Sequence, residues 1–186
     1  MKWGLGVAAW VFQDGNYGDF EAGQRIEAAI EFCFDAVERT DERGLPGSTL
    51  VEGSRYDLVG RVVVAQHDAW VIDAGILAYC DQAPPAGVSV GATVRGRAYL
   101  GVDPFTYFER LAHDARFPAM IYAWRMQRIL RAARSTSVSG GASATIWKQV
   151  EQTNAWVDDA GHAEYLLECD LLADPPKRSS ETAIPT

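Results

Sequence analysis

The sequence has few of the features that mark metal sites, disulfide frameworks and membrane spans. Only three cysteines occur among 186 residues, Cys33, Cys80 and Cys169. No CxxC or CxxxH spacing is present, so neither a zinc site nor a set of disulfides is indicated. No apolar run approaches the roughly 20 residues of a transmembrane helix, and the apolar N-terminus lacks a small-x-small cleavage site. We therefore expect buried cysteines, no metal, no cofactor, no membrane contact and a cytoplasmic location.

Sequence signatures of enzymes are also missing. HExxH, GxSxG, the P-loop and the dinucleotide-binding fingerprint do not occur, and the chain has only three histidines. A scattered site that uses His67, Asp73 or His162 for metal-assisted or acid–base hydrolysis remains an alternative. The missing motifs favour a protein that is not an enzyme.

The composition is that of a folded protein, with 48% hydrophobic, 11% aromatic and 23% charged residues. A chain of this length buries enough surface to fold without a metal or disulfide. We expect one β-rich domain over residues 1–172. Residues 173–186 consist largely of proline, serine, threonine and charged residues, which predicts a disordered tail.

Apolar residues alternate with period two along the first half of the chain, which is typical of β-strands. In residues 26–35 the apolar side is Ile26, Ala28, Ile30, Phe32 and Phe34, and the other side is largely acidic. The pattern predicts further strands at 3–12, 56–66, 69–80 and 88–100, with a loop at 41–54 and a turn at 81–87. Residues 69–80 are apolar on both sides, which indicates a central strand covered on both faces.

The second half of the chain shows both helical and strand patterns. Asp103-Pro104 predicts the start of a helix that ends at Pro118. Residues 119–134 fit either a helix or a strand, and the surrounding pattern favours a strand to about Gln127. Residues 144–152 and 163–172 are predicted to pair as a hairpin around 158–161, after a loop at 135–143.

These elements predict a mainly β fold with one or two helices, arranged as an antiparallel barrel or sandwich. The glycine-marked, curled strands with a late helix resemble an OB-type barrel over about residues 20–130.

A short phrase occurs more than once. Residues 69–75 read AWVIDAG and residues 155–161 read AWVDDAG, with a looser copy at 9–15. The functional interpretation is that the copies present aromatic side chains at equivalent corners. The structural interpretation, which we favour, is that Trp and Val fill a sheet face while Asp and Gly supply the following turn.

Charge is segregated along the chain. Residues 95–148 hold nine basic and three acidic residues, whereas both flanking segments are acidic and the whole chain has a net charge of −8. Arginine forks suit phosphates, and an adjacent tyrosine can stack a base. The candidate binding residues are Arg95, Arg97, Tyr99, Arg125 and Arg128. Two arguments oppose this hypothesis: the overall acidity disfavours nucleic acid, and acidic strands can neutralise basic ones across a sheet.

The sequence therefore supports three functional hypotheses. The first is a non-enzymatic, β-rich binding module for an unknown protein partner or for a second copy of itself. The second is an OB-like barrel that binds nucleic acid through the arginine-rich segment 95–134. The third is a small hydrolase or metal-dependent enzyme.

Overall fold

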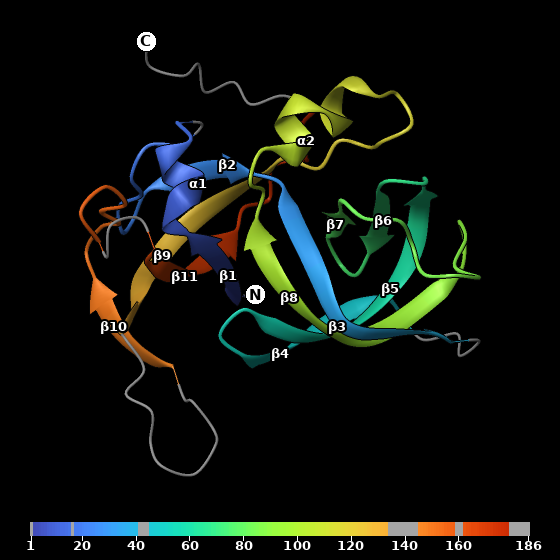
Figure 1. Cartoon of the computed structure of the whole chain (residues 1–186), viewed down its shortest axis with the longest axis horizontal. Helices are drawn as coiled ribbons and strands as arrows, with labels where there is room; N and C mark the ends of the chain where they lie inside the picture. The colour runs from blue at the N-terminus through green and yellow to red at the C-terminus, as the bar shows by residue number, and fades with distance from the viewer. Residues whose placement is uncertain (1, 16, 41–44, 134–144, 159–161, 179–186) are drawn as a thin grey trace.

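The computed structural model describes residues 2–15, 17–40, 45–133, 145–158 and 162–178, and these form a mainly β protein (Figure 1). The strands are β1 (Lys2–Ala8), β2 (Arg25–Ala28), β3 (Ile30–Thr40), β4 (Gly47–Glu52), β5 (Arg55–Ala65), β6 (Trp70–Asp73), β7 (Leu77–Cys80), β8 (Thr93–Val102), β9 (Tyr122–Ala133), β10 (Ile146–Val150) and β11 (Glu164–Leu171). The helical elements are α1 (Ala9–Gln13), α2 (Thr106–Glu109) and the 3-10 turn η1 (Leu111–His113). The predicted fold class is confirmed. No helix in these ranges is long and apolar enough to span a membrane.

Five strands close into a barrel. β3 pairs with β7 and β8, β7 pairs with β6, β6 pairs with β5, and β5 returns to β8. The alternating residues of β3 supply part of the barrel core. Ile30 and Phe32 are fully buried, whereas Cys33 and Asp35 are exposed. The prediction of a buried Cys33 is therefore wrong. The predicted resemblance of residues 20–130 to an OB-type barrel stays a prediction.

β4 pairs with β5 at the edge of the barrel, and the other strands form a second wall beside it. β8 pairs with β1 at Gly6–Gly101, β1 pairs with β11, and β11 pairs with β9. β9 then pairs with β2, which leads into β3 through the buried Ala29. Trp3 and Trp124 pack edge to face at 6.1 Å between ring centroids inside this wall. One hydrophobic core thus extends through both parts of the fold.

Residues 69–80 form a hairpin rather than the single strand that was predicted. Gly75 has φ +94°, and its N–H donates to Asp73 Oδ1 at 3.1 Å, so the chain reverses between β6 and β7. Glycine adopts this left-handed conformation without steric cost. The prediction that both faces are covered is correct, because Val71 and Tyr79 are buried beneath the segment that contains α2 and η1.

Other elements differ from the prediction in their bounds. The first strand ends at Ala8, and α1 follows it. Strand β4 lies inside the expected loop at 41–54, and β8 begins only at Thr93. The helix after Asp103 spans only four residues before η1. The strand preferred for 119–134 is confirmed, and β9 continues to Ala133.

β10 and β11 do not form the predicted hairpin. Each pairs antiparallel with β9 instead, for example Gln149 with Leu130 and Leu166 with the same residue. Pairing with a long central strand was invisible in the local pattern, because period-two alternation does not specify the partner. The predicted loop at 135–143 and part of the turn at 158–161 lie outside the described residues.

The chain after β11 remains in contact with the fold as far as it is described. Lys177 exchanges two backbone hydrogen bonds with Ile121, at 2.8 and 2.9 Å, and its Nζ lies 3.3 Å from Glu27 Oε1. The Arg178 guanidinium donates to the backbone oxygen of Phe117 at 2.5 Å. The expected tail is therefore docked at least over 177–178, and residues 179–186 lie outside the described residues.

Candidate binding surfaces

Three of the five predicted binding residues lie on one outer face of the barrel. Arg95, Arg97 and Tyr99 alternate with buried residues along β8. Arg95 Nε donates to Glu38 at 2.8 Å, and Arg97 Nε donates to Asp57 at 3.0 Å. Each carboxylate lies directly opposite its arginine on a neighbouring strand. Acidic strands therefore neutralise this face from both sides.

Tyr99 lies on the same face in a cradle of two glycines. A Cβ at Gly6 would approach the Tyr99 hydroxyl to 1.9 Å, and a Cβ at Gly101 would approach the ring to 2.8 Å. The ring thus covers both glycines while 37% of the residue remains exposed. Burial, together with the nearby Glu164 and Glu31, raises the pKa of Tyr99. Carboxylates beside the ring disfavour a phosphate-bearing ligand at this position.

The other two predicted residues lie in the second wall. Arg125 and Arg128 belong to β9, which does not pair with β8. Arg128 Nε donates to Glu168 at 2.8 Å, and Arg125 lies opposite Asp170 of β11. The five residues therefore form no single basic patch, and acidic side chains lie between them. This arrangement does not favour the nucleic-acid hypothesis.

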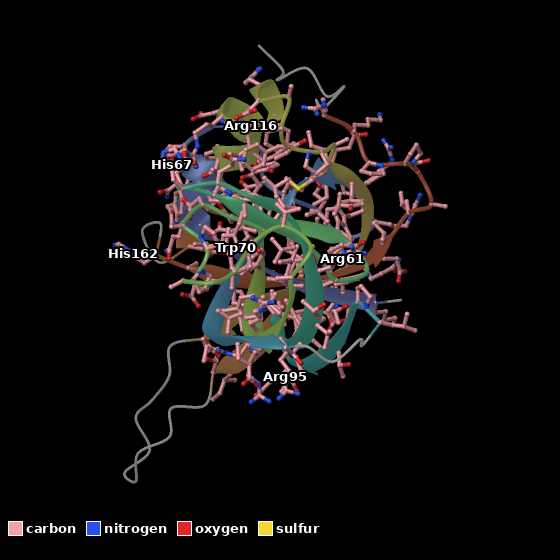
Figure 2. The ribbon with its side chains drawn as sticks, turned by 90° about the vertical axis from the view of Figure 1, so that its right-hand side faces the viewer. Arg61, His67, Trp70, Arg95, Arg116 and His162 are labelled. Atoms are coloured by element: carbon pink, nitrogen blue, oxygen red, sulfur yellow. The ribbon has the colours of Figure 1, made fainter. Side chains whose placement is uncertain are left out.

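The repeated phrase does not occupy equivalent corners. Trp70 is only 3% exposed and lies in β6 inside the barrel (Figure 2). Trp10 lies in α1 and is 47% exposed, and Trp156 lies in a turn and is 69% exposed. The interpretation as sheet face plus turn is correct for residues 69–75 alone.

Two copies of the phrase nevertheless come together. Ala9 and Ala155 are both fully buried. The Gln13 side chain donates to the Ala155 carbonyl at 2.8 Å, which fastens α1 to the turn after β10 (Figure 1). Trp10 lies one turn before Gln13, and residues three apart share a helix face. Trp10, Trp156 and Val157, the last 72% exposed, therefore lie exposed on two segments that are in contact. We call these three residues the tryptophan surface.

An acidic pocket of about 580 Å³ lies at the C-terminal end of α1, where Asp14 forms part of its lining. Its lining consists of Asp14, Asp81, Pro104, Phe105, Thr106, Glu109 and Arg110. Within the described residues, none of its three carboxylates has an ion-pair partner, whereas Arg110 pairs with Asp68 at 2.6 Å. Asp14 directly follows α1, and its N–H donates to the Trp10 carbonyl at 3.1 Å. The pocket and the tryptophan surface are thus adjoining features.

Two more acidic residues lie close to the pocket lining: Asp103 directly precedes Pro104, and Glu31 interacts with Asp81. Asp103 is fully buried and accepts hydrogen bonds from the Tyr79 hydroxyl and from the backbone N–H of Tyr107 at 3.1 Å. Burial, together with Asp81 and Asp103, raises the pKa of Glu31 to about 7. A carboxyl that titrates near neutrality suits acid–base chemistry, but Glu31 is not among the residues that line the pocket.

We expect Glu31→Gln to stabilise the protein at pH 8 but not at pH 5. The folded-state pKa of about 7 lies above the ordinary 4.5, so the folded state binds more protons between these values. Wild-type stability consequently falls as pH rises through this range. The difference corresponds to roughly 3 kcal/mol, which solvent screening at a partly exposed group reduces to about 1–2 kcal/mol. Urea unfolding at both pH values measures the effect.

Glu52→Gln, at an exposed carboxylate in β4, provides the control for that experiment. Its unfolding free energy is expected to differ from wild type by the same small amount at pH 5 and at pH 8. An equal pH dependence in wild type and Glu31→Gln would show that Glu31 does not titrate near 7.

The residues of the scattered-site hypothesis do not assemble. His67 and His162 are both exposed (Figure 2). Asp73 Oδ1 is engaged by the turn at Gly75. The described ranges contain no group of three or more His, Cys, Asp or Glu residues that could hold a metal ion.

Comparisons of the chain with protein-family models, with curated proteins and with solved structures find no match.

Proposed function

We propose that this chain is a non-enzymatic binding module that holds a protein partner through the tryptophan surface. The observation that carries this proposal is the joint exposure of Trp10, Trp156 and Val157, at 47%, 69% and 72%. Single exposed apolar residues are ordinary on protein surfaces, whereas apolar residues that gather mark interaction sites. Tryptophan is among the residues most enriched at the energetic centres of protein interfaces.

The charge pattern supports a protein partner over nucleic acid. The arginines of β8 are engaged by Glu38 and Asp57, and the pocket beside the tryptophan surface carries only one arginine. Affinity for nucleic acid depends largely on cations that release counterions from phosphates. An end of the molecule that carries indoles and carboxylates does not meet that requirement.

Self-association is the second candidate, because β4 is an edge of the sheet and carries the exposed Leu50 and Val51. An exposed apolar edge strand is a template for pairing with another strand. Light scattering during size-exclusion chromatography distinguishes the two candidates, since the first predicts a monomer and the second a dimer.

The decisive experiment compares three forms of the protein as bait: wild type, the double variant Trp10→Ala/Trp156→Ala, and Leu50→Ala as a matched control. Each is cross-linked in lysate of the source cells, and captured proteins are quantified by mass spectrometry. We expect a partner that wild type and Leu50→Ala recover equally and that the double variant recovers about tenfold less. All three should melt at similar temperatures, because exposed substitutions change stability little.

The proposal fails if no captured protein depends on the two tryptophans. Loss of a partner from Leu50→Ala alone would instead support binding at the β4 edge.

A further inference from the structure

We propose that the segment seated on the tryptophan surface is basic, and that one of its lysine or arginine side chains enters the acidic pocket. This inference rests on the proposed function and adds the chemistry of the partner to it. The pocket's position supports it, since Asp14 both follows α1 and lines the pocket. A partner segment that covers Trp10 therefore passes the pocket mouth.

Charge complementarity selects the occupant. Asp14, Asp81 and Glu109 line the pocket, and within the described part of the chain none of them is paired with a cation. Arg110, the one basic residue in the lining, is engaged by Asp68. An anionic side chain would meet repulsion here, and a neutral one would leave three carboxylates uncompensated. A cation supplies the missing counter-charge.

The apolar part of the lining suits a lysine or arginine in particular. Phe105 and Pro104 contribute the pocket's apolar wall. Lysine and arginine carry a long aliphatic stem behind the charged head, and this stem packs against apolar surface. The exposed indole of Trp10 offers a further site for a cation, because the face of an aromatic ring attracts positive charge.

Two further acidic groups lie close to the pocket lining, since Asp103 directly precedes Pro104 and Glu31 interacts with Asp81. Tyr17 stacks on Phe105 with ring centroids 5.7 Å apart, and its buried hydroxyl has no hydrogen-bond partner in the described residues. Asp103 lies close enough to raise the pKa of Tyr17, although burial is the larger cause. The carboxylates of Glu31 and Asp81 likewise interact unfavourably with each other. A cation bound beside Asp81 would reduce this unfavourable interaction.

The test uses two blocked peptides, acetyl-Gly-Leu-Arg-Leu-Gly-amide and the same peptide with glutamate in place of arginine. Binding to the full chain is followed by intrinsic tryptophan fluorescence and by calorimetry at low salt. We expect the arginine peptide to bind with a Kd of about 1 mM or tighter, and to bind more weakly as salt rises. The glutamate peptide should not bind measurably in that range.

Variants locate the binding. Asp14→Asn/Glu109→Gln is expected to weaken the arginine peptide about fivefold, and Trp10→Ala should weaken it as well. Glu52→Gln removes from β4 an exposed carboxylate that has no ion-pair partner among the residues the structure describes, and should leave the affinity unchanged. Equal binding of the two peptides, no binding of either, or equal effects of the pocket and control variants would overturn the inference.

These outcomes are separable from failure of the proposed function. A partner whose capture depends on Trp10 and Trp156 but not on the pocket carboxylates leaves the binding module standing and removes only the basic occupant. If capture of the partner does not depend on the two tryptophans, both the proposed binding module and the basic occupant are excluded.

Discussion

Trp70→Ala is expected to lower the free energy of unfolding by about 3–5 kcal/mol. The side chain is only 3% exposed and packs edge to face on Phe32, with ring centroids 4.9 Å apart, and it stacks on Phe34 at 6.0 Å. Truncation removes a large apolar surface from the barrel and leaves a cavity that close-packed neighbours refill only in part. Urea unfolding followed by circular dichroism measures the loss.

Trp156→Ala is the matched control, because it removes the same side chain from another copy of the same phrase. Trp156 is 69% exposed, so its replacement should change the unfolding free energy by less than about 0.5 kcal/mol. Similar losses at both positions would mean that Trp156 is packed, which would also remove the basis of the tryptophan surface.

The contrast between these two residues shows where the sequence pattern was informative. Strand periodicity predicted the inward side of residues 26–35, because burying one face of a sheet imposes alternation along a strand. It missed the break between β2 and β3 at Ala29, which was assigned to the outer side and is fully buried. The phrase AWV has no such constraint. The three residues of this phrase lie at a barrel strand at 69–71, in a helix at 9–11 and in a turn at 155–157. Tertiary contacts therefore decide the conformation of the phrase.

The candidate sites depended still more on contacts between distant residues. The sequence revealed blocks of opposite charge, but which carboxylate faces which arginine depends on the strand order, which places Glu38 and Asp57 on either side of β8. The tryptophan surface depends on a hydrogen bond between Gln13 and Ala155, 142 positions apart. Its only signal in the sequence was the repeated phrase. The acidic pocket combines residues from three separate segments and had no local signal.

Asp103→Ala is expected to cost about 3–5 kcal/mol of unfolding free energy. The fully buried carboxylate accepts from the Tyr79 hydroxyl, from the Tyr107 N–H at 3.1 Å and from the Phe108 N–H at 3.4 Å. It thereby joins the β6–β7 hairpin to the first turn of α2. Alanine takes this acceptor away from all three donors, and a buried donor left unpaired costs about 1–3 kcal/mol before relaxation. Chemical denaturation at pH 7 measures the change.

Tyr79→Phe distinguishes two contributions to the cost of Asp103→Ala. One is the loss of the hydrogen bond between Tyr79 and Asp103, and the other is the burial of a Tyr79 hydroxyl that has lost this acceptor. Phenylalanine removes one donor and leaves Asp103 with two backbone N–H groups, so the single variant should cost less than Asp103→Ala. In the double variant Asp103→Ala/Tyr79→Phe no hydroxyl is left without an acceptor. Its cost should therefore be smaller than the sum of the single costs by about 1 kcal/mol or more, as expected for residues in contact. Additive costs would show that the hydroxyl finds another acceptor, and that Asp103 stabilises the fold through the backbone of α2 alone.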